Sequence, residues 1–123
     1  MIQKILWLDD IRDPDDFTVF KDYKCDITWV KTYEKAIQRM TTESFDTVSL
    51  DNDLGTIKEG IDVFNWIDEH LYFNDIQILN NIKTIFIHSS NVEARRYMLS
   101  ARSNFYEKYG VLVTIFPTRY KRV

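Results

Sequence analysis

Three short polar segments hold most of the residues that could do chemistry in this chain. Asp9-Asp10, Asp51-Asn52-Asp53 and His88-Ser89-Ser90-Asn91 each follow a short apolar run. Carboxylates that lie close together repel each other unless a cation or a proton separates them. If the fold brings the segments together, we expect Asp9, Asp10 and Asp51 to bind a divalent metal, Mg²⁺ above all, because this hard cation prefers oxygen ligands.

The segment that begins at His88 could bind and process a phosphate. His88 could move protons near neutral pH, and Ser89 and Asn91 could bond a phosphate oxygen at the start of a helix. Arg95 or Arg96 could neutralise charge on that phosphate. Each feature also has an ordinary explanation. His88 could be a buried structural histidine, Ser89–Asn91 a helix cap, and Asp9-Asp10 a turn.

Five segments rich in β-branched and aromatic residues are predicted strands. They are Ile5–Leu8, Ile27–Val30, Thr47–Leu50, Thr84–Ile87 and Val111–Phe116. Most are almost continuously apolar, which is typical of parallel strands covered on both faces. Every connection between them is long enough for a parallel crossover.

Apolar residues at helical spacing predict three helices between these strands. One covers Tyr33–Met40 with Thr32 as N-cap, the second covers Ile61–Leu71, and one long helix runs from Val92 past Phe105 to a stop near Gly110. Asp13-Pro14 predicts only a short helix or an irregular crossover, because Phe17, Val19 and Phe20 do not extend the pattern. Seven residues follow Phe116, so we expect the last helix to be missing or truncated and one flank of the sheet to be thinly covered.

The alternation of strands and helices predicts one α/β domain over residues 1–123, a doubly wound five-stranded parallel sheet. Ligands of such sheets bind at the carboxyl ends of the strands. The three polar segments all lie at that edge in this arrangement. The predicted fold therefore supports the predicted metal and phosphate site.

Composition narrows the class of protein further. The single cysteine, Cys25, excludes an internal disulfide and favours a reducing cytoplasm. The amino-terminal residues lack the pattern of a signal peptide, and no run approaches the roughly 20 apolar residues of a membrane span. We therefore expect a cytoplasmic protein without a membrane segment.

The net charge of −3 hides a strong asymmetry. Residues 1–75 hold 17 acidic and 8 basic side chains, whereas residues 76–123 hold 2 acidic and 8 basic ones. The basic second half could attract phosphates or an acidic protein partner, or it could simply be a solvated surface. Its basic residues are scattered rather than dense, so we do not expect double-stranded DNA binding.

Four blocks of sequence resemble the cyclic-phosphate processing receiver domains, which derive from the receivers of two-component signalling. The blocks are LWLDDIRDP at 6–14, WVKTYEKA at 29–36, SLDNDLG at 49–55 and HSSN at 88–91. The resemblance implies a receiver-like, flavodoxin-like fold and the processing of cyclic phosphates of nucleotides or RNA ends. It implies that Asp9, Asp10 and Asp51 bind the metal, and that Arg12, Asp53, His88, Ser89 and Asn91 line the same pocket.

The chain departs from the family pattern at several positions. Asn52 stands where the family has a histidine, and Val92 and Ala94 stand where it usually has proline and glycine. Phe116 occupies the place of the lysine that ends the last strand of signalling receivers. These departures leave three hypotheses: a metal-dependent phosphoesterase, a non-catalytic protein-interaction module of an accessory or defence-related kind, and an aspartyl-phosphate switch.

The enzyme hypothesis assigns a role to each candidate residue. His88, Asp51 and Arg12 are the predicted catalytic residues. Ser89, Asn91, Arg95 and Asp53 are predicted to bind the substrate. The third hypothesis ranks last because Phe116 cannot supply the charge of the missing lysine.

Overall fold

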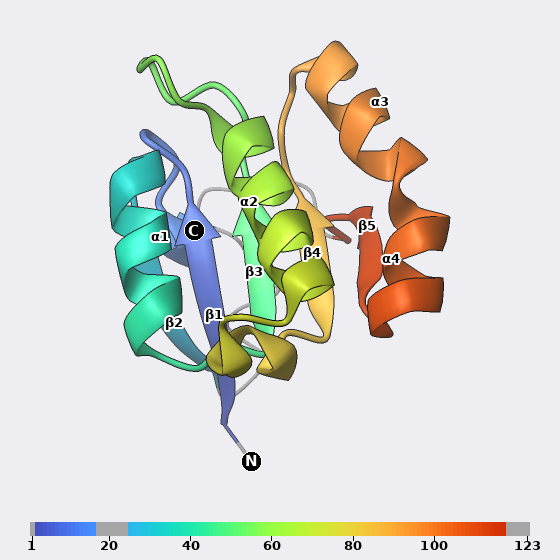
Figure 1. The fold of residues 1–123 in the computed structure, drawn as a ribbon. Coiled ribbons are helices and arrows are strands. Elements are labelled where there is room, and N and C mark those ends of the chain that lie inside the picture. The colour runs from blue at the N-terminus through green and yellow to red at the C-terminus, as the bar shows by residue number, and fades with distance from the viewer. Residues whose placement is uncertain (1, 17–24, 118–123) are drawn as a thin grey trace.

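The chain folds around a five-stranded parallel sheet, as predicted (Figure 1). The computed structural model describes residues 2–16 and 25–117. Its strands, in the spatial order β2-β1-β3-β4-β5, are β1 (Gln3–Leu8), β2 (Cys25–Val30), β3 (Thr47–Leu50), β4 (Thr84–Ile87) and β5 (Leu112–Ile115). All four pairings are parallel, so every strand presents its carboxyl end to the same edge.

The predicted first and second helices are confirmed as α1 (Tyr33–Thr42) and α2 (Gly60–Phe73). The Thr32 side chain caps α1 by accepting a hydrogen bond from the Lys35 amide. Pro14–Asp16 forms the short 3₁₀ helix η1 after Asp13, and Gln77–Asn81 forms another, η3. The predictions for Phe17, Val19, Phe20 and a truncated last helix concern residues 17–24 and 118–123, outside the described part of the chain.

The prediction of one long helix after β4 is wrong. The segment forms two helices, α3 (Val92–Ser100) and α4 (Arg102–Tyr109), which meet at Ala101. Ala101 adopts φ −90° and ψ 0°, and its amide bonds to the Met98 carbonyl in a tighter turn that ends α3. The predicted stop at Gly110 is confirmed, since Gly110 closes α4 with a φ of 69°.

Alternating side chains of the strands point to two different cores. Leu6 and Leu8 belong to the main core beneath the helices, whereas Trp7 packs with Phe116 in a small second cluster. In Figure 1 helices α1 to α4 lie over the same side of the sheet. Among the described residues, none of the helices combines the length and apolar character needed to cross a membrane.

Candidate metal and phosphate site

Register brings the three polar segments to one level of the sheet. Leu8 of β1 pairs with Leu50 of β3, which pairs with Ile87 of β4. The next residue of each strand is Asp9, Asp51 or His88. Backbone hydrogen bonds from Asp51 to Leu8 and from His88 to Leu50 continue the ladder to this point. The pairing of the strands therefore fixes the backbone positions from which these three side chains extend.

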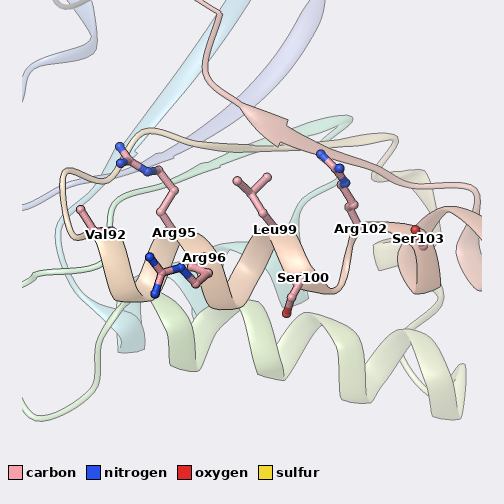
Figure 2. Close-up of a pocket in the computed structure, with 7 residues that line it drawn as sticks. All are labelled: Val92, Arg95, Arg96, Leu99, Ser100, Arg102 and Ser103. Atoms are coloured by element: carbon pink, nitrogen blue, oxygen red, sulfur yellow. The ribbon is translucent and has the colours of Figure 1, made fainter.

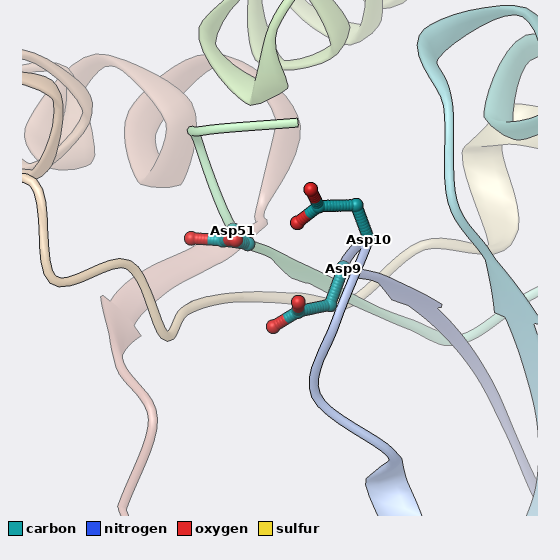
Figure 3. A group of neighbouring side chains, drawn as sticks. All are labelled: Asp9, Asp10 and Asp51. Atoms are coloured by element: carbon teal, nitrogen blue, oxygen red, sulfur yellow. The ribbon is translucent and has the colours of Figure 1, made fainter. Parts of the chain in front are cut away.

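Three carboxylates meet at this edge (Figure 3). One oxygen from each of Asp9, Asp10 and Asp51 lies within 4.8 Å of the other two. Asp9 and Asp51 are buried, and Asp10 is half-buried. A set of closely spaced carboxylates with surplus negative charge fits a hard divalent cation such as Mg²⁺. The cluster expected from the sequence is thus present and could bind a metal.

Asp51 is the carboxylate of the cluster whose ionised form the protein disfavours. Burial, followed by the charge of Asp9, raises the pKa of Asp51 to about 6, against the lowering effects of the Asn52 amide and Arg12. Its Oδ1 accepts a hydrogen bond from the Asn52 amide at 2.9 Å. A cation at the cluster would favour the ionised form of Asp51 and relieve its repulsion with Asp9.

The protein favours the ionised form of Asp9, in contrast, because it provides hydrogen-bond donors for both carboxylate oxygens. Oδ1 accepts from the amides of Ile11 and Arg12 at 2.9 and 2.8 Å, and Oδ2 lies 3.1 Å from His88 Nε2. Burial would raise the pKa of Asp9, but these hydrogen bonds together hold it below the usual value. Asp9 is therefore ionised and fixed in orientation at neutral pH.

His88 lies beneath Asp9 and within the second cluster. Its side chain is 3% exposed and stacks on Trp7 with ring centroids 3.8 Å apart. Since the ionised Asp9 oxygen can only accept, Nε2 must donate to it, and the neutral ring then accepts at Nδ1 from the Ser49 hydroxyl at 2.7 Å. Burial lowers the pKa of His88. The ring is thus placed to orient Asp9.

Arg12 brings a positive charge to the carboxylates. Its Nη1 lies 3.6 Å from Asp9 Oδ2 and 3.9 Å from Asp51 Oδ1, and it donates to the His88 carbonyl at 3.4 Å. The Trp7 indole fixes the loop by donating to the Arg12 carbonyl at 2.9 Å. About a third of the Arg12 side chain is exposed, so a dissolved anion such as a phosphate could also contact it.

Asn52 is a structural residue in this chain. Its side-chain oxygen accepts from the Ile61 amide at 2.9 Å, and its carbonyl accepts from the Gly60 amide at 2.9 Å. Its side-chain amide donates to Asp53 Oδ1 at 3.0 Å. Asn52 therefore joins the end of β3 to the first turn of α2.

Ser89 and Asn91 order the turn that leads into α3. Asn91 Oδ1 accepts from the Ala94 amide, which makes Asn91 the N-cap, and Ser89 Oγ accepts from the Asn91 amide at 3.0 Å. Asn91 Nδ2 donates to Asp53 Oδ1 at 3.0 Å and ties the two loops together. Arg95 reaches back to the Ser89 carbonyl at 3.4 Å. The predicted substrate-binding residues thus lie beside one another at this edge.

Sequence reasoning missed three residues that support the site. Ser49 bonds His88, Trp7 stacks on it, and Gly60 lets α2 approach closely, since a Cβ there would lie 1.7 Å from the Asp51 carbonyl oxygen. Strand alternation places Trp7 and Ser49 on the face opposite Leu8 and Leu50, and that signal could have identified both. No comparable signal marks Gly60.

The comparisons with known proteins agree with this architecture. Residues 4–104 match the model of the cyclic-phosphate processing receiver domain. The match covers most of the chain, so the chain belongs to this family. No curated protein matches the chain.

Solved structures of response regulators share the fold at low sequence identity. The HemR receiver domain from Leptospira biflexa is 21% identical, with 94% of this chain and 82% of that chain covered and a TM-score of 0.55. A response regulator from Thermotoga maritima is 17% identical, with 98% and 89% covered and a TM-score of 0.59. NtrX from Brucella abortus is 16% identical, with a TM-score of 0.63. The match covers 99% of this chain and 25% of the NtrX chain.

Proposed function

We propose that this protein binds Mg²⁺ through Asp9, Asp10 and Asp51 and processes a cyclic phosphate of a nucleotide or RNA end beside it. The convergence of these three carboxylates within 4.8 Å is the observation that carries the proposal. The family to which the chain belongs supports the class of substrate. Charge supports it too, since an acidic cluster would repel a phosphate unless a cation lay between them.

The chemistry would open the phosphate ring by hydrolysis. One ring P–O bond breaks, hydroxide from water joins the phosphorus, and a proton passes to the departing oxygen. Mg²⁺ held by Asp9, Asp10 and Asp51 would supply Lewis-acid stabilisation of the negative charge that develops on the phosphate. Arg12, held near both Asp9 and Asp51, would neutralise further negative charge on the phosphate.

The remaining residues would position this machinery. His88 is almost wholly buried, with Asp9 on Nε2 and Ser49 on Nδ1. We therefore assign it a positioning role toward Asp9, and its predicted role as general acid or base stays a prediction. Asp53, Ser89 and Asn91 would hold the two loops around the phosphate.

A panel of cyclic phosphates tests the proposal. Purified protein is incubated with Mg²⁺ or Mn²⁺ and with 2′,3′- and 3′,5′-cyclic nucleotides, and ring-opened monoesters are measured by chromatography. We expect turnover by the unchanged chain and by Asp26→Asn, an exposed control on β2, and none by Asp51→Asn. Equal product from the unchanged chain and Asp51→Asn would overturn the proposal.

An observation also favours the second hypothesis, a protein-interaction module. Ile11 and Ile57 are 80% and 98% exposed in the loops that follow β1 and β3. Under this hypothesis, these two exposed side chains would form part of the contact with the partner. If this hypothesis holds, one stoichiometric partner binds the chain and its Asp51→Asn variant equally, Ile57→Ser loses that partner, and the cyclic-phosphate panel shows no turnover.

A further inference from the structure

The fold gathers scattered arginines into one surface groove. An open pocket of about 600 Å³ lies along α3 and the start of α4, and Arg95, Arg96 and Arg102 are among its lining residues (Figure 2). Figure 2 shows Arg95, Leu99 and Arg102 extending toward the same side of the helix pair, with Arg96 next to Arg95. We call this surface the arginine groove.

The arginine groove starts at the candidate phosphate site. Asn91 caps α3, and Arg95, one turn further, donates to the Ser89 carbonyl at 3.4 Å. A molecule whose terminal phosphate lay at the carboxylates could therefore continue across Arg95 and along α3. A single cyclic mononucleotide has no second phosphate to place there.

A second hollow extends the groove toward the edge strand β5. It measures about 290 Å³, shares Arg102 and Ser103 with the first pocket, and is also lined by Tyr106. Tyr106 is 65% exposed. Exposed aromatic rings next to positive charges are typical of surfaces that bind single-stranded nucleic acid, because each base can stack on a ring whatever its identity.

We infer that the arginine groove binds the backbone phosphates of a single-stranded RNA, with Tyr106 stacking on one of its bases. The inference rests on the proposed function for the chemistry at the RNA end, and it makes the substrate an RNA terminus rather than a mononucleotide. Arginine suits this role, since its planar guanidinium bonds phosphate oxygens in pairs. Repeated phosphates and a stackable base match the groove better than an acidic peptide, which offers charge alone.

Fluorescence anisotropy with labelled RNA of about eight nucleotides tests the inference. The RNA carries a 3′-hydroxyl in one series and a 2′,3′-cyclic phosphate in the other, and the full chain is titrated at several salt concentrations. We expect Arg102→Gln to weaken binding of both RNAs about fivefold to tenfold and to reduce the salt slope by about 0.7. Tyr106→Ala weakens both without changing that slope.

Lys108→Gln is the matched control, since it removes one positive charge from α4 while Lys108 lies against Tyr72, outside the groove. Absence of RNA binding, or equal losses in Arg102→Gln and Lys108→Gln, would overturn the inference. Tighter binding of an octaglutamate peptide with the same dependence on Arg102 would overturn it in favour of an acidic protein segment. The 3′-hydroxyl series needs no catalysis, so groove binding without turnover in the cyclic-phosphate panel would contradict the proposed function alone.

Discussion

Asp9 and Asp51 are neighbours at the sheet edge, but the protein shifts their pKa values in opposite directions. Asp9 accepts hydrogen bonds on both oxygens, which hold its pKa below the usual value despite burial. Burial and the charge of Asp9 raise the pKa of Asp51 to about 6. The repulsion between the two carboxylates costs free energy in the metal-free protein, and a cation bound between them would recover it.

Asp51→Asn should stabilise the metal-free protein at pH 7. A carboxyl whose pKa is raised from 3.8 to about 6 on folding contributes stability below pH 3.8 that is lost as the pH rises through 6. Asparagine keeps the shape without the charge, so we expect a gain on the order of 2 kcal/mol at pH 7 that vanishes near pH 4. Urea unfolding in EDTA measures it. A variant less stable than the unchanged chain at pH 7 would contradict the assignment.

Ser49→Ala should destabilise the fold by leaving His88 Nδ1 without the hydroxyl at 2.7 Å. The net loss of one hydrogen bond between side chains costs about 0.5–1.5 kcal/mol. We expect a loss in that range from urea unfolding. Ser90→Ala, at an exposed neighbouring position, should change stability by less than about 0.5 kcal/mol. Equal stabilities of the two variants would show that the Ser49–His88 bond contributes nothing.

At the scale of elements, the site depends on how closely α2 approaches β3. The Gly60 amide donates to the Asn52 carbonyl, and the Ile61 amide donates to Asn52 Oδ1. Asn52 thus joins the end of β3 to the start of α2 through two hydrogen bonds, one to its carbonyl oxygen and one to its side-chain oxygen. A histidine at position 52, as the family has, would lack the side-chain oxygen that bonds the Ile61 amide.

Gly60→Ala should be far more damaging than Gly110→Ala. A Cβ on Gly60 would lie 1.7 Å from the Asp51 carbonyl oxygen, so the start of α2 must move and the carboxylate cluster with it. We expect a loss of about 3 kcal/mol or more from this overpacking. Gly110 has φ +69° and open space around its Cβ position, so alanine there costs about 1–2 kcal/mol. Comparable losses in urea unfolding would contradict the close-approach argument.

Sequence patterns predicted most of the elements because their signals are local. Apolar runs marked the five strands, and the Thr32 cap and the Gly110 stop marked helix ends. The division between α3 and α4 was missed because no proline or glycine stands at Ala101. Met98 and Phe105, on either side of Ala101, are both buried, and their spacing is equally compatible with one straight helix. Tertiary packing, which no local pattern records, accounts for the difference.

The same limit applies to the candidate site. Strand ends indicated that Asp9, Asp51 and His88 share an edge, because register follows from parallel pairing. Strand alternation places His88 on the same face as Trp7 and Ser49, but it does not predict whether the His88 ring is exposed to solvent or packs in the second cluster. The structure places it against Trp7.

At the scale of the whole molecule, folding joins an acidic edge to a basic flank. The carboxylates come from the acidic first part of the chain, and the arginine groove comes from residues 76–123, which hold 8 basic and 2 acidic side chains. A metal ion at the first region and phosphates along the second would complement the two charge distributions together. Among the described residues, Arg95, Arg96 and Arg102 of this basic half line the arginine groove.

Magnesium should stabilise the whole molecule. A ligand that binds only the folded state at 100 times its Kd adds about 2.7 kcal/mol, which raises Tm by roughly 10 °C in a domain of this size. We expect that rise for the unchanged chain in MgCl₂ and none for Asp51→Asn. NaCl of equal ionic strength serves as the control for screening. An equal rise in both proteins would place the cation elsewhere.

A crystal of the protein grown with Mn²⁺, as a substitute for Mg²⁺, and a 2′,3′-cyclic nucleotide tests the proposed metal and phosphate site most directly. We expect one anomalous scattering peak within coordination distance of Asp9, Asp10 and Asp51, with the cyclic phosphate beside it and Arg12 contacting the phosphate. A peak away from these carboxylates, or a nucleotide bound remote from them, would contradict it.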